Sequence, residues 1–424
     1  MLGFLAILCF IGTPLFAVIA MSAMVGYHSE EIDLMAFVIE ILGLADMPFL
    51  SAIPLFTVAG YLLSESNAPK RLVRLTDALL GWMPCGLAVV SLFTCAFFTA
   101  FTGASGVTII AMGAILYPAL NSDAYDESFS LGLITTSGSL GLLFAPSLPL
   151  ILYGVIAEVS IDDLFKAGLL PGLLMLLMLS IYCFWVGRHS NRRTKPFNFK
   201  KLVSAFRESI WELPLPIIVL GGIYSGLFAI SEAAAITALY VLVVEVVILK
   251  EIKIGQLPSL MRESMLLVGG ILVVLAVSLA STNYMIDAGI PQKIFHTISG
   301  IVSSQFTFLA LLLCFLLILG AILDIFAAIV LVVPLLLPVA NQYDVNSVHL
   351  GIIFLSAMQL GYLTPPVGLN LFIASYRFNK SIATVYNATL PFFCLLYTSP
   401  SQRDQRGEGM PSAALKKKSG GGGG

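Results

Sequence analysis

The chain has 424 residues, of which 58% are hydrophobic and only 11% are charged, and its formal net charge is −2. Its mean hydropathy is +0.97. Soluble globular domains carry about 25% charged residues, so this composition excludes a soluble globular protein. The net charge is small and the basic residues are confined to short loops. The sequence therefore shows no basic surface of the kind that binds nucleic acid.

The first 26 residues are apolar but lack a basic region and a small-residue cleavage site. We therefore expect a first membrane helix there rather than a cleaved signal peptide. The six cysteines all lie in apolar stretches without C-x-x-C spacing. That pattern predicts buried small side chains, and neither a disulfide framework nor a metal site.

Charge-free stretches show where the chain crosses a membrane. No Asp, Glu, Lys or Arg occurs in residues 78–122, 128–157, 167–187 or 345–376. A helix crosses the hydrocarbon core with about 20 residues, so each stretch is long enough to span it. The fold class is therefore an all-α polytopic membrane protein. We expect apolar segments at 2–26, 48–64, 83–120, 129–157, 164–187, 212–229, 232–249, 264–281, 306–340, 348–376 and 382–398.

Two of these segments, 83–120 and 306–340, are too long for one span. The first is interrupted by Gly103-Ala104-Ser105-Gly106, and the second by Gly320 and Asp324. Non-helical backbone is tolerated inside the bilayer only where it is buried in protein or lines a cavity. Each segment is therefore either two joined crossings or a hairpin that enters and leaves by the same face.

Two further segments are apolar throughout but contain helix-breaking residues. Segment 129–157 is interrupted at 135–139 and then at Pro146 and Pro149. Segment 348–376 is interrupted by Gly361, Thr364, Pro365, Pro366 and Gly368. Because proline removes a helical hydrogen bond and clashes with the preceding turn, both helices are predicted to be discontinuous.

The remaining charges orient the chain. Basic residues cluster at 70–74 and at 188–207, and the acidic residues Glu158, Asp162 and Asp163 lie between them. The positive-inside rule places both basic loops in the cytoplasm and the acidic loop outside. We expect Glu212, Glu245 and Asp287 to be interfacial, Glu232 to start a helix, and 33–46 and 69–80 to be amphipathic interfacial helices.

A pattern in the first half recurs 220 positions later. Leu140-Gly141-x-Leu143-x-x-Pro146 matches Leu360-Gly361-x-Leu363-x-x-Pro366. We predict an internal duplication whose halves, by the count of crossings, are inverted. Residues 1–187 form the first half with its hairpin near 83–120, 188–211 a basic cytoplasmic linker, and 212–395 the second half with its hairpin near 306–340. We expect the polar residues 396–424 to be disordered or non-native.

Inverted repeats with helices broken near the bilayer midplane are typical of secondary transporters. Unwound backbone frees carbonyl groups for Na⁺, and the N-terminus of a half-helix attracts anions. An intramembrane enzyme and an ion channel are the alternatives. However, the four histidines are isolated, no H-E-x-x-H motif occurs, and the absence of G-x-x-x-x-G-K-[ST] agrees with transport driven by a gradient.

The motifs resemble those of the large membrane (M) permease subunit of TRAP, or tripartite ATP-independent periplasmic, transporters. The resemblance covers roughly residues 1–394. It is carried by Gly132-Leu-Ile-Thr-Thr-Ser-Gly-Ser-Leu-Gly141 with Pro146-Ser147 and Tyr153-Gly154, Leu164-Phe165-x-Ala-Gly-x-x-Pro171-Gly172, Ser231-Glu232-Ala-Ala-Ala235 and Gly361-x-x-Thr-Pro-Pro-Val-Gly368.

The resemblance implies a Na⁺-coupled importer in the bacterial inner membrane, without enzyme activity and without a cofactor other than the coupling ion. Its cargo would be a small organic acid, with a C4-dicarboxylate or a sugar acid as candidates. Its partners would be a small four-helix membrane (Q) subunit and a periplasmic substrate-binding (P) protein. The fold would be of the elevator type, with two re-entrant hairpins and two discontinuous helices.

Carried over position by position, the resemblance implies hairpin tips at Thr102–Thr108 and Gly320–Asp324 and helix breaks at Thr135–Ser139 and Gly361–Gly368, and the candidate site residues lie in or next to these parts. For substrate they are Ser105, Gly106, Pro146, Ser147, Thr364, Pro365, Pro366 and Asn370. For Na⁺ they are Thr102, Gly103, Thr135, Ser137, Gly138, Gly320, Asp324, Gly361 and Thr364.

Overall fold

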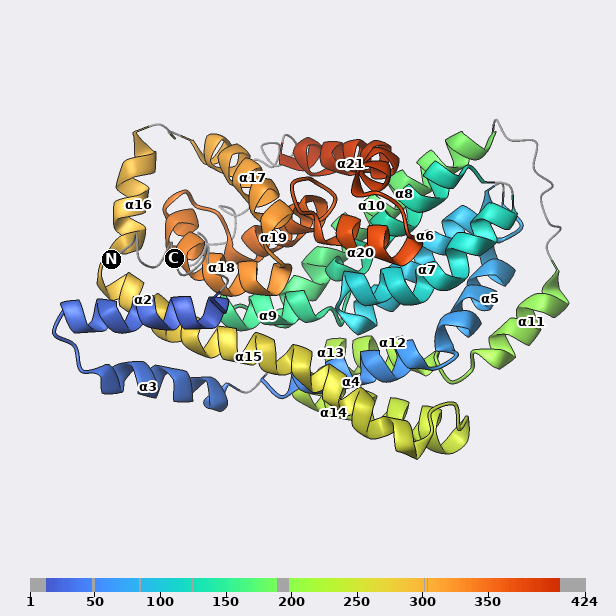
Figure 1. The fold of residues 1–424 in the computed structure, drawn as a ribbon, viewed down its shortest axis with the longest axis horizontal. Coiled ribbons are helices and arrows are strands. Elements are labelled where there is room, and N and C mark those ends of the chain that lie inside the picture. The colour runs from blue at the N-terminus through green and yellow to red at the C-terminus, as the bar shows by residue number, and fades with distance from the viewer. Residues whose placement is uncertain are drawn as a thin grey trace, which may run out of the picture.

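The computed structural model of the chain describes residues 13–47, 50–83, 85–123, 125–188, 198–300, 302 and 304–404. Within these ranges all regular structure is helical (Figure 1). The helices of the first half are α2 (Leu15–Ser29), α3 (Leu34–Gly43), η1 (Leu44–Asp46), α4 (Ala52–Glu65), α5 (Ala68–Leu80), α6 (Gly86–Thr102), α7 (Ser105–Ser122), α8 (Glu127–Ser137), η2 (Leu140–Leu143), α9 (Leu148–Ile156) and α10 (Ile161–Arg188).

Helix α11 (Phe199–Glu208) follows, within the stretch predicted to be the linker. The chain continues with α12 (Pro214–Pro216), η3 (Ile217–Gly221), α13 (Gly222–Tyr224), α14 (Ile230–Leu242), η4 (Val243–Ile248), η5 (Ile254–Gln256), α15 (Leu257–Asp287), α16 (Ile290–Ser299), α17 (Gln305–Ile322), α18 (Ile325–Gln342), α19 (Ser347–Gly361), α20 (Leu369–Phe378) and α21 (Ile382–Asp404). In Figure 1, α2, α3, α4, α14 and α15 lie along one side of the molecule.

Six of the described helices are long and apolar enough to cross a membrane, and a seventh span results if the bent pair α8–α9 counts as one. The chain is therefore a multi-pass membrane protein. Of the expected first helix, α2 is described, whereas residues 1–12 lie outside the described part of the chain. At the other end, α21 continues to Asp404, into the segment expected to be disordered, and 405–424 lie outside the described residues.

Both overlong segments fold as helical hairpins. Gly103 and Ala104 join α6 to α7, and Leu323 and Asp324 join α17 to α18, so both turns lie at the interruptions predicted from sequence. The two tips line one common cavity. Two full crossings would place the turns on opposite surfaces of the membrane, so the shared cavity favours re-entrant hairpins that meet tip to tip.

Both apolar segments that contain prolines are discontinuous, as predicted. After α8 the chain forms the short helix η2 and then α9, with a bend of 42°. After α19 it forms turns before α20 begins at Leu369. The Ala145–Pro146 and Pro365–Pro366 peptide bonds are both cis.

A buried ion cluster joins α5 to the second half. The Arg71 guanidinium contacts Glu212 (Nε–Oε1, 2.6 Å), Glu245 (Nη2–Oε1, 3.3 Å) and Glu251. Glu212 and Glu245 are buried within the protein, with 2% and 1% of their surface exposed, and their expected position at the membrane interface stays a prediction. An isolated charge buried in protein is strongly unfavourable, so these glutamates depend on Arg71. Glu232 lies in the first turn of α14, as expected, and Asp287 is the last residue of α15.

Replacing Arg71 by alanine should destabilise the protein by about 3–5 kcal/mol, because it leaves buried carboxylates without their counter-charge. Arg74→Ala is the matched control, since its pair with Glu208 is exposed and such pairs contribute about 0–1 kcal/mol. Glu245→Gln should have a small effect, because two carboxylates still face the guanidinium. Thermal unfolding in detergent measures all three. Equal melting of the Arg71 and Arg74 variants would show that the cluster contributes nothing to stability.

Candidate functional site

The first hairpin tip packs against the first helix interruption. Thr99 Oγ1, on α6, lies 2.9 Å from the carbonyl oxygen of Gly138 and 2.7 Å from Thr108 Oγ1. A Cβ atom added at Gly141 would lie 2.2 Å from the carbonyl oxygen of Ala96, so only glycine permits this approach of η2 to α6. The hairpin thus supplies hydrogen-bond partners that a bilayer cannot offer to the broken helix.

The second tip and the second interruption repeat this arrangement. The N–H groups of Val367 and Gly368 donate to the carbonyl oxygen of Ala321, at 3.2 and 3.0 Å. In return, Ile325 N–H donates to Tyr362 Oη at 2.5 Å. A Cβ atom at Gly361 would lie 2.6 Å from Gly320 Cα, so these two candidate glycines allow backbone to meet backbone.

Asn370, on α20, connects the two halves. Its Oδ1 accepts a hydrogen bond from Ser105 Oγ at the first tip (2.7 Å). Its Nδ2 donates to the carbonyl oxygen of Thr135 in the first interruption (3.4 Å). The side chain is completely buried, and both of its polar atoms are therefore paired within protein. In this structure Asn370 positions the first tip instead of lining the cavity.

The two tips enclose a cavity of about 430 Å³. One side is formed by Gly103–Val107 of the first hairpin and Asp324–Ala327 of the second. The opposite side is formed by α15 through Leu266, Gly270 and Ile271, with Tyr61 from α4. The volume lies within the range of small-molecule sites, which is about 300–1,000 Å³.

The two hairpin tips present opposite charge to this cavity. No lysine, arginine or histidine of the described residues lines it. At the first tip, no side chain of the described residues caps the N-terminus of α7. At the second tip, Asp324 caps α18 by accepting from the N–H groups of Phe326 (2.9 Å) and Ala327 (3.3 Å). One tip therefore presents the positive end of a helix, and the other presents a carboxylate.

Buried hydroxyl groups without partners lie around the first interruption. Thr102 Oγ1, Thr136 Oγ1 and Ser147 Oγ have no hydrogen-bond partner among the described residues. Such a group costs about 1–3 kcal/mol unless something satisfies it. Oxygen atoms of hydroxyl and carbonyl groups at unwound helices are the ligands that transporters use for Na⁺. These unpaired hydroxyl oxygens are neutral groups of the kind that bind a cation.

The candidate residues divide into two groups by position. Gly103, Ser105, Gly106 and Asp324 line the cavity. The other candidates lie behind or beside it: Thr102, Thr135, Ser137, Gly138, Pro146, Ser147, Gly320, Gly361, Thr364, Pro365, Pro366 and Asn370. Among these, the Thr135, Ser137 and Thr364 hydroxyls donate to nearby carbonyls of the local chain, and Pro365 and Pro366 are exposed.

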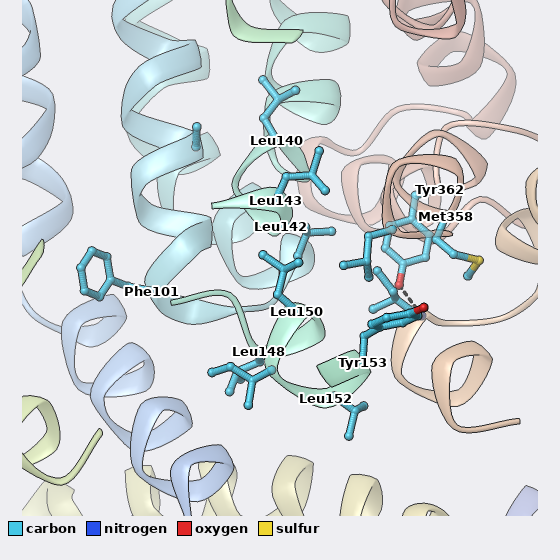
Figure 2. Packing of buried hydrophobic residues seen from close by; sticks show 14 of the residues in the cluster. Phe101, Leu140, Leu142, Leu143, Leu148, Leu150, Leu152, Tyr153, Met358 and Tyr362 are labelled. Atoms are coloured by element: carbon cyan, nitrogen blue, oxygen red, sulfur yellow. Dashed lines mark hydrogen bonds between the residues drawn. The ribbon is translucent and has the colours of Figure 1, made fainter. Parts of the chain in front are cut away.

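Sequence reasoning missed several residues of the cavity. Tyr61, Tyr362 and the α15 residues Leu266, Gly270 and Ile271 were not candidates, although all of them line it. A signal was present for α15, because Gly269 and Gly270 interrupt an otherwise apolar helix. A Cβ atom at either glycine would meet nothing within 4 Å, so these glycines leave open space. Figure 2 shows Tyr362 and Met358 beside Leu142 and Leu143 of η2 and Leu150 of α9.

Two inward hairpins, two broken helices and a cavity between the tips define a secondary transporter of the inverted-repeat class. The fold is shared with a solved structure, the YdaH transporter of Alcanivorax borkumensis. That match has a TM-score of 0.61 and 13% sequence identity, and it covers 88% of each chain.

The chain belongs to the family described as the DctM component of tripartite ATP-independent periplasmic transporters, which matches residues 2–399. The isethionate TRAP transporter permease protein DctMQ of Oleidesulfovibrio alaskensis is 32% identical over 399 residues, which is 93% of this chain. The match spans only 62% of that longer protein.

Two further relatives are similar to the chain over 82% of each length. They are the C4-dicarboxylate TRAP transporter large permease protein DctM of Pseudomonas aeruginosa and the ectoine TRAP transporter large permease protein TeaC of Halomonas elongata, each 31% identical. These relatives are named as transporter permeases rather than as enzymes, and the chain is accordingly a transporter subunit.

Replacing Asn370 by alanine should destabilise the protein by about 1–3 kcal/mol, because Ser105 Oγ and the Thr135 carbonyl lose a buried partner. Asn341→Ala is the matched control, since Asn341 is exposed at the end of α18. Thermal unfolding in detergent compares them. If the two variants melt together, the link between the halves through Asn370 has no energetic role.

Proposed function

We propose that the chain is the large subunit of a Na⁺-coupled importer that moves a small organic acid across the bacterial inner membrane. The observation that carries the proposal is the cavity between the two tips, with α15 as its opposite side. The acid would be delivered by a periplasmic binding protein and carried together with a small four-helix membrane subunit. C4-dicarboxylates and sugar acids are the candidate substrates, and the named relatives handle C4-dicarboxylate, isethionate and ectoine.

The charges of the cavity support coupling to a cation. An anion in the cavity is attracted by the uncapped N-terminus of α7 but repelled by Asp324. With no basic side chain among the described lining residues, a bound cation is the simplest source of the missing positive charge. Na⁺ ions at the two interruptions would supply it. One would lie by Thr102, Gly103, Thr135, Ser137 and Gly138, and another by Gly320, Asp324, Gly361 and Thr364.

Transport would proceed by alternating access of the elevator type. The substrate would bind against Ser105 and Gly106, with its carboxylate at the positive end of α7. The hairpins, α8–α10 and α19–α21 would then move together against α4 and α12–α15. Because the cavity lies between these two groups of helices, their relative movement would change the side from which it is open.

Uptake by proteoliposomes tests this function directly. The full chain, its small membrane partner and the binding protein are reconstituted, and radiolabelled carboxylates are offered with and without an inward Na⁺ gradient. We expect saturable uptake that needs both the gradient and the binding protein. Non-saturable flux would favour the alternative of an ion channel, and chemical conversion of the substrate would favour an intramembrane enzyme.

Asp324→Asn tests the role of the carboxylate in binding Na⁺. Asparagine caps helices about as well as aspartate, so stability should change by well under about 1 kcal/mol. Loss of the charge should raise the Na⁺ concentration for half-maximal uptake at least tenfold. Asp344→Asn is the matched control, because Asp344 is exposed outside the cavity. An unchanged Na⁺ dependence in the Asp324 variant would remove this residue from the Na⁺ site.

A further inference from the structure

A polar pocket lies between α5 and α11, away from the cavity of the hairpin tips. Its volume is about 250 Å³. Its charged lining residues are two cations, Arg74 and Lys201, and two acids, Asp77 and Glu208. Arg74 and Glu208 pair with each other at 3.0 Å, whereas Asp77 and Lys201 make no ion pair with a described residue. The pocket therefore offers one free positive and one free negative group.

An apolar groove of about 690 Å³ begins beside this pocket. It is lined by Leu80 and Met83 from the end of α5 and its following turn, Phe93 of α6, and Leu173, Leu177 and Trp185 of α10. From Leu173 to Trp185 an α-helix rises about 18 Å. This is close to one leaflet of the bilayer, which is half of a core roughly 30 Å thick.

The two cavities adjoin at the turn after α5. Gly81 and Trp82 line the polar pocket, whereas Leu80 and Met83 line the groove. The Trp185 end of α10 lies at this same turn, because a Cβ atom added at Gly187 would overlap Cys85 Sγ. Tryptophan side chains favour the interface between hydrocarbon and water. The polar pocket therefore lies at the membrane surface, and the groove runs from it into the hydrocarbon.

We propose that the pocket and the groove together bind one phospholipid with a zwitterionic amine headgroup, phosphatidylethanolamine. An acyl chain occupies the groove, the phosphate lies at Lys201, and the ammonium group lies at Asp77. One unpaired cation beside one unpaired acid favours this headgroup over an anionic one, because its ammonium group neutralises Asp77, whereas a headgroup that carries only the phosphate charge leaves Asp77 without a counter-charge. The lipid would bind where α5 continues into the first hairpin.

Native mass spectrometry of the full chain tests the headgroup preference. The protein is delipidated and then given equal amounts of dioleoyl phosphatidylethanolamine and dioleoyl phosphatidylglycerol. We expect at least fivefold more bound phosphatidylethanolamine. Asp77→Lys, which leaves three cations and one acid, should reverse the preference toward phosphatidylglycerol. A misfolded variant cannot gain a new preference, so an unchanged ratio for Asp77→Lys would overturn the assignment of the headgroup.

A second pair of variants tests the groove. Leu177→Trp should fill it and lower the retention of both lipids at least fivefold. Leu170→Trp is the matched control, because Leu170 is exposed on the same helix but does not line the groove. Size-exclusion profiles and thermal unfolding verify that both variants fold. Equal retention by the two folded variants, or a preference of the unaltered protein for phosphatidylglycerol, would overturn the proposed site.

Discussion

The structure depends on hydrogen bonding of main-chain groups where helices are interrupted. Hydrocarbon offers no partner to a free N–H or carbonyl group, so a break inside a membrane protein must be satisfied by protein. Here each break is satisfied by the hairpin tip of its own half. Gly138 contacts Thr99 of the first hairpin, and Val367 and Gly368 donate to Ala321 of the second. Asn370 then joins the first break and the first tip to the second half. The position of each hairpin tip therefore depends on its contacts with the broken helix of the same half.

This arrangement explains why the centre of the molecule is suited to binding small charged solutes. Its polar groups belong mostly to the backbone and to hydroxyl side chains, which are neutral, so their burial costs much less than the burial of ionised side chains. The one acidic side chain at the tips, Asp324, accepts hydrogen bonds from two N–H groups at the start of α18. The uncapped end of α7 provides the opposite polarity across the same cavity. The two halves are thus similar in backbone but differ in the charge that they present.

Much of this could be predicted from sequence, because membrane insertion leaves a clear pattern. Charge-free stretches identified the helices, and Gly103–Gly106, Asp324 and the prolines at 146 and 366 identified the tips and interruptions. Contacts between distant segments could not be predicted in the same way. Nothing local in the sequence shows that Arg71 lies against Glu212 and Glu245, or that Asn370 contacts Ser105. The side of the cavity formed by α15 was missed for the same reason, since its residues are ordinary apolar helix residues apart from Gly269 and Gly270.

The Arg71 cluster also bears on which parts could move. Arg71 ties the first turns of α5 to Glu212, Glu245 and Glu251, which come from the region of α12 and η4. The other end of α5 continues through a tight turn into α6, where Gly81 and Gly86 approach so closely that a Cβ atom at Gly86 would lie 2.6 Å from Gly81 Cα. Helix α5 is held at its first turns and is joined to the first hairpin by a short turn. The hairpin can therefore move relative to α5 only by rotation about that turn. Under the proposed mechanism, the first hairpin would therefore pivot near Gly81 and Gly86 while α15, on the opposite side of the cavity, stays in place.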